Sequence, residues 1–442
     1  MATVHLRDAL CWVWRSRFLR RGRLRLTAPG VLAVVMLVVA LSLIGEVLLF
    51  TPLTPGVVGW DFNSAYEAAR TILHGGNPYL GEYVNAPSLA LLAVPLTILP
   101  EPLAYLVFVI GSIAAIGVLS GLLARAMGWS QPILVAVLVT TSWTATLSFY
   151  LGKPEPLLFA ASAGAVLLIW RGALFWAGAL VGFLLVKPTV TWPILVFLAL
   201  ALWPERRAVA RYLGGLAAST VIFVGLGFWD IPRWISAVLH YSKQIGSQGT
   251  MAGLDGLLHV FPAQWGFGTG LSSPFTWGVL AIGLVGLAWV ARRVATPGAW
   301  SDSRVRVAWA AALPVAIWIL VTPYAHTYDD VFLIPLLLLI VGADAHEVRR
   351  PVVAVAALAL AIFPGMNERG MFLEGGPSLA PLAAMLLVAL GVLSMRVGGP
   401  PGDHLALAGG DGGPRGGRAG GAGLCSGGAP TPAVTSRTAS RP

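Results

Sequence analysis

The feature that most constrains this chain is a series of apolar stretches, each near the length of a membrane-spanning helix and separated by short polar breaks. A helix needs roughly 20 apolar residues to cross the hydrocarbon core of a bilayer. Backbone polar groups in lipid must also find hydrogen bonds within their own segment. Hydrophobic side chains make up 57% of the 442 residues and charged ones 11%, which excludes an ordinary soluble domain. The sequence therefore predicts an all-α polytopic membrane protein.

Twelve spans are expected, and counts from eleven to thirteen fit because several stretches are shorter than 18 residues. A further apolar segment at 87–99 is too short to span and is expected to dip into the membrane or lie along its interface. The spans lie at about 31–50, 103–124, 131–149, 155–170, 172–186, 188–203, 209–228, 274–291, 305–322, 330–343, 351–364 and 378–395.

The two ends of the chain differ from this central part. Residues 1–30 form an arm with seven arginines, and the apolar run that follows lacks a small-x-small cleavage site, so we expect an uncleaved first span. Residues 31–396 form the transmembrane domain. Residues 397–442 are rich in glycine and proline without periodicity, which predicts a disordered cytoplasmic tail.

The distribution of basic residues predicts the orientation. With the amino terminus in the cytoplasm, six of the 29 lysines and arginines face outward, so both termini are expected inside. The outer loops are then 51–102, 229–273, 323–329 and 365–377. The net charge of +10 is explained by this topology, and no nucleic-acid-binding motif accompanies it. Arginine outnumbers lysine 26 to 3, which fits a high-GC bacterial genome.

The first outer loop carries the most informative residues. Apolar and aromatic side chains recur at helical spacing over 62–74, which predicts an amphipathic helix on the membrane that ends at Gly75 and Gly76. Asp61 directly precedes this helix. One interpretation is that its carboxylate caps the helix; the other is that it is a general base that takes a proton from an acceptor hydroxyl.

Several stretches together resemble glycosyltransferase family 87, which belongs to the GT-C superfamily of polyprenyl-phosphate-sugar-dependent enzymes. They are the run from Asp61 to Tyr79, the segment 87–100 with its three prolines, and Thr322 to Asp329. The resemblance covers about residues 30–395 in layout and implies a GT-C-like fold. It also implies an inverting transfer of mannose, or in some members arabinofuranose, from a lipid-linked phosphosugar. In such enzymes an aspartate of the first outer loop is the catalytic base, and Asp61 matches that position.

Displacing a phosphate from an anomeric carbon passes through an oxocarbenium-like transition state, which needs a carboxylate for the nucleophile. It also needs cationic groups for the leaving phosphate. The candidates for the donor phosphate and sugar are His326, Lys187, Lys153 and Tyr324. The alternatives are that His326 is a hydrogen-bonded wall residue and that the lysines snorkel to the interface. Many family members have Gln in the place of Lys153.

Aromatic and amide side chains of the two long outer loops are candidates for the acceptor site. Tryptophans there can instead be interfacial anchors. The acceptor candidates are Tyr66, Asn63, Asn77, Tyr79, His240 and Trp265. No metal site and no cofactor are expected, because the adjacent acids Asp329 and Asp330 lack the further ligands that a divalent ion prefers.

The predicted function is a glycosyltransferase of the bacterial plasma membrane with an extracytoplasmic active site. It moves a hexose, with mannose the leading candidate, from a polyprenyl-phosphate sugar to a glycolipid or glycan acceptor, and its partners are these substrates and the bilayer rather than nucleic acid. The alternatives are a transporter or flippase for lipid-linked sugars or small molecules, and a non-catalytic membrane scaffold. Transporters place ionisable residues or broken helices near mid-membrane, often in repeated halves, and the sequence shows neither clearly.

Overall fold

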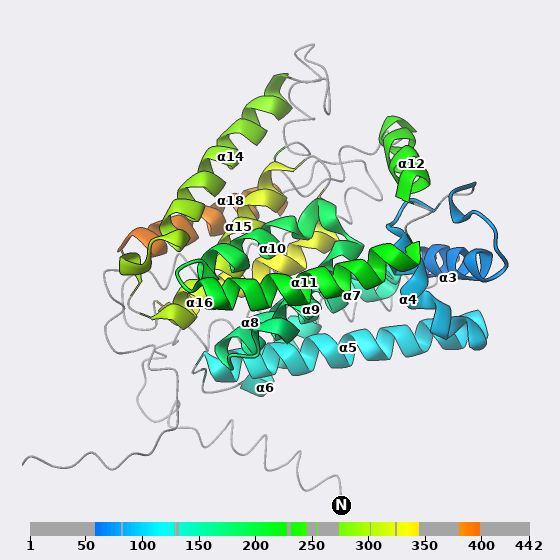
Figure 1. Cartoon of the computed structure of the whole chain (residues 1–442), viewed down its shortest axis with the longest axis horizontal. Helices are drawn as coiled ribbons and strands as arrows, with labels where there is room; N and C mark the ends of the chain where they lie inside the picture. The colour runs from blue at the N-terminus through cyan, green and yellow to red at the C-terminus, as the bar shows by residue number, and fades with distance from the viewer. Residues whose placement is uncertain are drawn as a thin grey trace, which may run out of the picture. The chain divides into compact units, whose positions relative to one another are not determined.

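The structure is a computed structural model (Figure 1), and it divides into residues 1–407 and residues 408–442. All the described residues belong to the first unit: 58–80, 83–127, 129, 132–227, 231–244, 254, 274–300, 302–322, 325–343 and 380–397. This part of the chain contains α-helices and short 3-10 helices and no β-strand. The all-α prediction is therefore confirmed for it.

Three described helices are long and apolar enough to cross a membrane, namely α5 (Glu101–Ala126), α14 (Pro274–Ala295) and α15 (Ser303–Val321). Shorter apolar helices stand beside them: α8 (Glu155–Trp170), α9 (Leu174–Gly182) with the 3-10 helix η4 (Phe183–Val186), and α10 (Pro188–Leu202). The other helices are α3 (Trp60–Leu73), α4 (Pro87–Ala93), α6 (Pro132–Thr140), α7 (Trp143–Leu151), α11 (Arg206–Gly227), α12 (Ile231–Gln244), α16 (Ile334–Ala343) and α18 (Ala380–Val397). The remaining 3-10 helices are η2 (Pro78–Leu80), η3 (Val94–Ile98), η8 (Pro297–Ala299) and η9 (Thr327–Leu333).

The described helices follow the expected spans closely, with three interruptions. The stretch 131–149 is divided between α6 and α7, the stretch 172–186 ends in η4, and the stretch 330–343 begins within η9. The expected spans at 31–50 and 351–364, the arm 1–30 and the tail 397–442 lie outside the described residues, apart from Val397 itself. The count of twelve therefore stays a prediction. The short segment at 87–99 folds as α4 and η3, which pack against α3.

Prolines set the starts of two helices that matter for the site. A proline lacks a backbone N–H and disfavours helical geometry in the residue before it, so it is well placed in the first turn of a helix. Pro154 precedes α8 and Pro188 begins α10. The lysine in front of each proline, Lys153 and Lys187, consequently lies in a break between helices.

Helix α15 lies at the centre of the described fold. Nearly all of its residues are buried, and it packs against α8, α10, α14, α16 and α18. Helices α9 and α11 cross with their backbones in close contact, because glycines meet there. A Cβ added to Gly215 would lie 2.8 Å from the carbonyl carbon of Phe175 and 2.9 Å from the backbone nitrogen of Ala179. Small residues of this kind let membrane helices approach closely.

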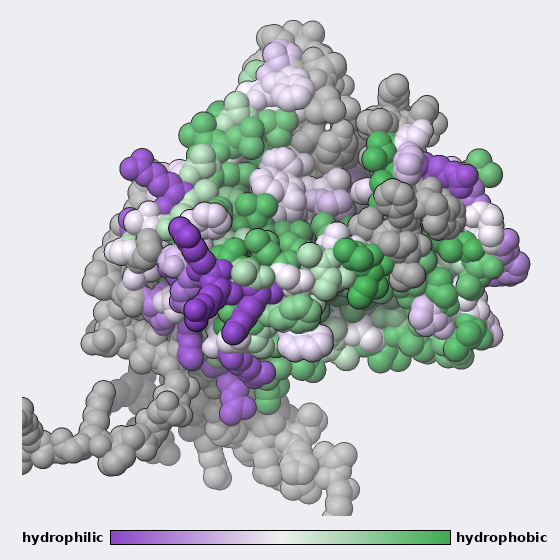
Figure 2. All heavy atoms as spheres, viewed as in Figure 1, coloured by the Kyte–Doolittle hydropathy of each residue, from purple (hydrophilic) through white to green (hydrophobic). Residues whose placement is uncertain are grey.

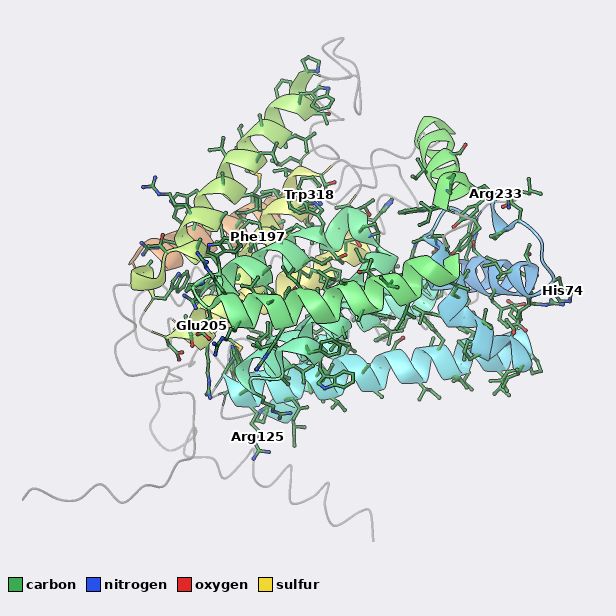
Figure 3. The ribbon with its side chains drawn as sticks, viewed as in Figure 1. His74, Arg125, Phe197, Glu205, Arg233 and Trp318 are labelled. Carbon is green, nitrogen blue, oxygen red and sulfur yellow. The ribbon has the colours of Figure 1, made fainter. Side chains whose placement is uncertain are left out.

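The two ends of the helices differ in charge. Helix α5 has Glu101 in its first turn and Arg125 in its last. Figure 3 shows Arg125 and Glu205 at one end of the helices, and His74 and Arg233 toward the other. Figure 2 shows a strongly hydrophilic group over the start of α11, where Arg206 and Arg207 are exposed, next to hydrophobic surface along α5 and α11. We call these the arginine end and the α3 end.

Helix α8 stops short of the α3 end. A Cβ on Gly164 of α8 would be 3.4 Å from the side chain of Leu119 of α5, so these two residues lie at one level. From there α5 extends about 27 Å to Glu101, whereas α8 extends about 14 Å to Glu155, at about 1.5 Å per residue. Glu155 is therefore recessed behind the end of α5, and α3 packs against α5 and α7 at that end.

Candidate functional site

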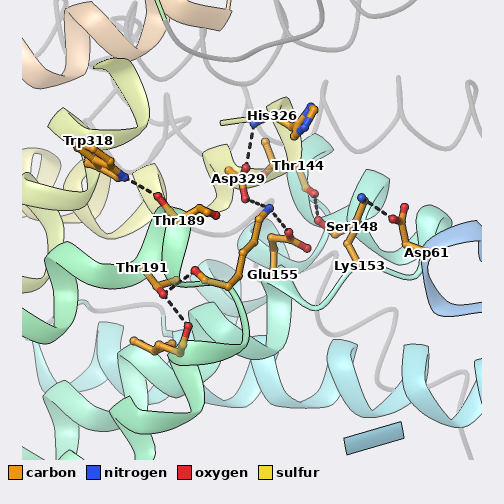
Figure 4. Close-up of polar contacts among 12 residues, drawn as sticks. Asp61, Thr144, Ser148, Lys153, Glu155, Thr189, Thr191, Trp318, His326 and Asp329 are labelled. Atoms are coloured by element: carbon orange, nitrogen blue, oxygen red, sulfur yellow. Dashed lines mark hydrogen bonds and ion pairs between the residues drawn. The ribbon is translucent and has the colours of Figure 1, made fainter. Parts of the chain in front are cut away.

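Asp61 lies in the first turn of α3, as shown in the close-up of Figure 4. Helix α3 was expected at 62–74 and is observed at 60–73, so the amphipathic helix is confirmed. The interpretation of Asp61 as its cap is wrong: Gly59 is the N-cap residue, and no side chain caps the helix. The Asp61 carboxylate instead accepts a hydrogen bond from Lys153, with 2.7 Å between Nζ and Oδ1. The two side chains are 28% and 16% exposed, so solvent reaches the pair only in part.

A junction between α3 and the end of α7 brings these two residues together. The backbone N–H of Gly59 donates to the carbonyl of Tyr150 at 2.8 Å. The hydroxyl of Tyr105 on α5 donates to the carbonyl of Phe149 at 2.7 Å. Gly152 ends α7 in the left-handed region, with φ +74°, and packs directly against Phe62 of α3. We call this contact the α3–α7 junction; Lys153 directly follows it.

The second lysine belongs to a triad of buried charges. The ammonium of Lys187 lies 2.6 Å from Oε1 of Glu155 and 2.6 Å from Oδ1 of Asp329. Both carboxylates are buried, with at most 1% of either side chain exposed. Glu155 begins α8, Lys187 precedes α10, and Asp329 belongs to η9, so the triad joins three elements that are distant in sequence. Pairing is needed there because an uncompensated charge is costly to bury.

His326 is connected to this triad through its backbone. Its N–H donates to Oδ2 of Asp329 at 2.9 Å. Burial, followed by the charges of Lys187 and Lys153, holds the pKa of the His326 ring well below its usual value of 6.5. The imidazole is therefore neutral near pH 7 and can donate one hydrogen bond without carrying a charge.

The structure places four of the predicted site residues in two polar groups: Asp61 with Lys153, and Lys187 and His326 with Glu155 and Asp329. The two groups are close enough for the charges of both lysines to lower the pKa of the His326 ring. Sequence reasoning did not include Glu155 or Asp329 among the site residues. Their partner Lys187 is 32 and 142 residues away in sequence. One sequence signal could have indicated these contacts. Glu155 and Asp329 are acids at the edges of apolar stretches, and a lysine in the same kind of position, such as Lys187, requires an acidic partner.

Several residues that were candidates for the acceptor-sugar site form hydrogen bonds within the protein itself. The Tyr66 hydroxyl donates to the carbonyl of Leu99 at 2.8 Å, and its ring is buried. Asn77 accepts from the backbone N–H of Tyr79 at 3.0 Å, and the Tyr79 hydroxyl donates to the carbonyl of Asn85. The Asn77 and Tyr79 contacts hold the loop after α3 together, and the Tyr66 contact ties α3 to the end of η3. Asn63 is exposed on α3.

Three other predicted residues lack a described side chain. His240 belongs to α12, whose backbone alone is described at that position. Tyr324 and Trp265 lie outside the described residues. Within the described ranges, no group of three or more His, Cys, Asp or Glu side chains could hold a metal ion.

The fold and the site define a helical membrane protein with a recessed polar site where several helices end. Comparison with known families gives its class: the sequence pattern of glycosyltransferase family 87 matches residues 83–323, more than half of the chain. The chain belongs to this family, which makes it a membrane glycosyltransferase. The matched stretch includes Lys153, Glu155 and Lys187, whereas Asp61 and His326 lie outside it. No curated protein and no solved structure matches this chain.

Proposed function

We propose that this protein transfers a hexose, with mannose the leading candidate, from a polyprenyl-phosphate sugar to a glycolipid or glycan acceptor, with inversion at the anomeric carbon. The observation that carries the proposal is Asp61: a partly buried carboxylate with Oδ1 engaged by Lys153. Oδ2 accepts no hydrogen bond from the described part of the chain. A carboxylate held on one side and open on the other suits a general base.

In the proposed step, Asp61 takes the proton of an acceptor hydroxyl while the acceptor oxygen forms a bond to the anomeric carbon. The bond between that carbon and the phosphate oxygen breaks, and polyprenyl phosphate leaves with the electron pair. One displacement inverts the anomeric configuration. In the same proposed step, neutral His326 donates a hydrogen bond to the leaving phosphate. Lys187 supports this role indirectly, because it pairs with Asp329, which accepts a hydrogen bond from the His326 backbone.

The proposed location is the extracytoplasmic side of the bacterial plasma membrane. Glu101 and Glu155 begin α5 and α8 near the site, whereas Arg125 and Arg171 stand at the other ends of the same helices. Helix α14 likewise ends on arginines. Under the positive-inside rule the arginine end faces the cytoplasm, and the α3 end with its site faces out. Family membership favours a transferase over the transporter alternative.

The test is transfer from a polyprenyl-phosphate mannose to a mannosylated lipid acceptor by the detergent-purified full-length protein. Asp61→Asn and Asp61→Ala are expected to lower kcat by about 10²-fold or more, as loss of a general base does. Glu67→Gln is the matched control, because Glu67 is an exposed acid on the same helix, paired with Arg70. Wild-type rates in both Asp61 variants would exclude Asp61 as the base. Failure of the wild type to transfer mannose or arabinose to any acceptor would refute the reaction itself.

A further inference from the structure

We propose that Lys153 is a positioning residue for Asp61 rather than a ligand of the donor phosphate. This inference rests on the proposed function and deepens it, because it assigns a role to a cation that sequence reasoning placed in the phosphate site. In the structure the Lys153 ammonium contacts the Asp61 carboxylate at 2.7 Å, across 92 residues of sequence. If the lysine moved to a phosphate, the base would lose the group that orients it.

The orientation of Asp61 depends on Lys153 because α3 does not supply it. An aspartate at a helix start ordinarily hydrogen-bonds to backbone N–H groups, but no side chain caps α3. The hydrogen bond from Lys153 to Oδ1 therefore fixes the carboxylate, and Oδ2 stays available for an acceptor hydroxyl. Holding a reacting group in one orientation before substrate arrives lowers the entropic cost of the reaction.

The α3–α7 junction shows that this contact is built into the fold. The Gly59–Tyr150 backbone bond and the Tyr105 hydroxyl hold the end of α7 against the start of α3. The backbone N–H of Lys153 also donates to the carbonyl of Ser148 at 2.8 Å, which completes the α7 terminus. Because both backbones are fixed in this way, the flexible lysine side chain has to span only a short gap.

Among the described residues around α3, Lys153 is the cation that can orient the Asp61 carboxylate. Among the described elements that pack against α3, α4 and η3 carry no ionisable side chain. The ionisable residues of the other neighbours include Glu101 and Tyr105 on α5, Tyr79 on η2 and Tyr150 on α7. On α3 itself, Arg70 pairs with Glu67 on the exposed surface. Lys153 is thus the cation in contact with Asp61 within the described part of the protein.

The experiment separates donor binding from turnover in the full-length protein. Binding of a polyprenyl monophosphate is measured by calorimetry in detergent, and kcat is measured in the mannose-transfer assay. For Lys153→Met we expect Kd within about twofold of wild type and kcat lowered about 10- to 100-fold, since the base is retained but misoriented. Lys153→Arg should recover much of kcat, because a guanidinium also donates to a carboxylate. Arg70→Met, which removes an exposed cation from α3, the helix of Asp61, should leave both quantities unchanged.

A double-mutant comparison makes the dependence on Asp61 explicit. If Lys153 acts through Asp61, then adding Lys153→Met to Asp61→Asn should cause little further loss of kcat. The thermal midpoints of the two single variants and the double variant give a readout without turnover, and the double variant should be no less stable than the weaker single one.

Two outcomes would overturn the inference. One is a tenfold or greater loss of polyprenyl-phosphate affinity in Lys153→Met with kcat preserved, which would make Lys153 a phosphate ligand. The other is additive effects of the two substitutions on the thermal midpoint. Failure of the proposed function looks different, because Asp61→Asn would then transfer sugar at the wild-type rate whatever Lys153 does.

Discussion

Substitution of Gly152 by alanine should disable the site without touching a charged residue. Gly152 ends α7 with φ +74°, a conformation that costs an alanine about 1–2 kcal/mol. A new Cβ would also lie 3.0 Å from the backbone nitrogen of Phe62 and 3.2 Å from its Cα, and nearer still to its Cβ. These atoms belong to α3 and cannot turn aside as a flexible side chain would.

The consequence for the ion pair follows from these distances. Ordinary contact begins near 3.4 Å, and the closest of these atoms must move furthest. A shift of α3 on the order of 1 Å relieves the clash. Asp61 moves with α3, so a shift of this size away from Lys153 lengthens the 2.7 Å distance between Lys153 Nζ and Asp61 Oδ1 beyond hydrogen-bonding range. A displacement of about 1 Å in a catalytic group can lower the rate about 100-fold, so kcat should fall by about 10- to 100-fold.

The assay compares Gly152→Ala with Gly172→Ala, measuring kcat for mannose transfer and the thermal midpoint in detergent. Gly172 has φ +75° but no atom within 4 Å of an added Cβ, so it reports the backbone strain without the clash. We expect both variants to lose some stability and only Gly152→Ala to lose most of its activity. Equal kcat values for the two variants would refute the reasoning that the α3–α7 junction sets the site.

Three further predictions concern packing, buried charge and protonation. Gly215→Ala should lower the thermal midpoint of unfolding, because its Cβ meets the backbone of α9, whereas its neighbour Gly214→Ala, with no atom within 4 Å, should not. Lys187→Met should destabilise the protein by about 3–5 kcal/mol, since it leaves two buried carboxylates without their cation. Lys187→Arg should retain more stability. An unchanged thermal midpoint of unfolding in Lys187→Met would show that the triad is not buried. His326 has a lowered pKa, so below about pH 6.5 the unfolded chain binds a proton that the folded protein does not, and stability falls as the pH is lowered. His326→Gln should lose less stability than wild type between pH 7 and pH 5.5, and parallel pH curves would contradict the assignment.

The sequence identified Lys153 and Lys187 as candidate site residues but not the acids that they contact. In the structure each of the two lysines precedes a proline and lies at a break between helices. Snorkelling and phosphate binding were the two roles weighed for them. Each lysine instead contacts carboxylates of the protein itself, because a cation at a recessed helix end is stabilised by an acid that another helix brings close.

The sequence alone determined the helical class, most helix boundaries and the amphipathic helix that begins beside Asp61. These depend on hydropathy, spacing and prolines, which act within a few residues of one another. The tertiary structure decided that Gly59 caps α3, that Asp61 pairs with Lys153, and that Glu155 and Asp329 share Lys187. Such contacts depend on which helix ends meet in space and on the level at which each helix ends relative to its neighbours, and a local sequence pattern contains neither.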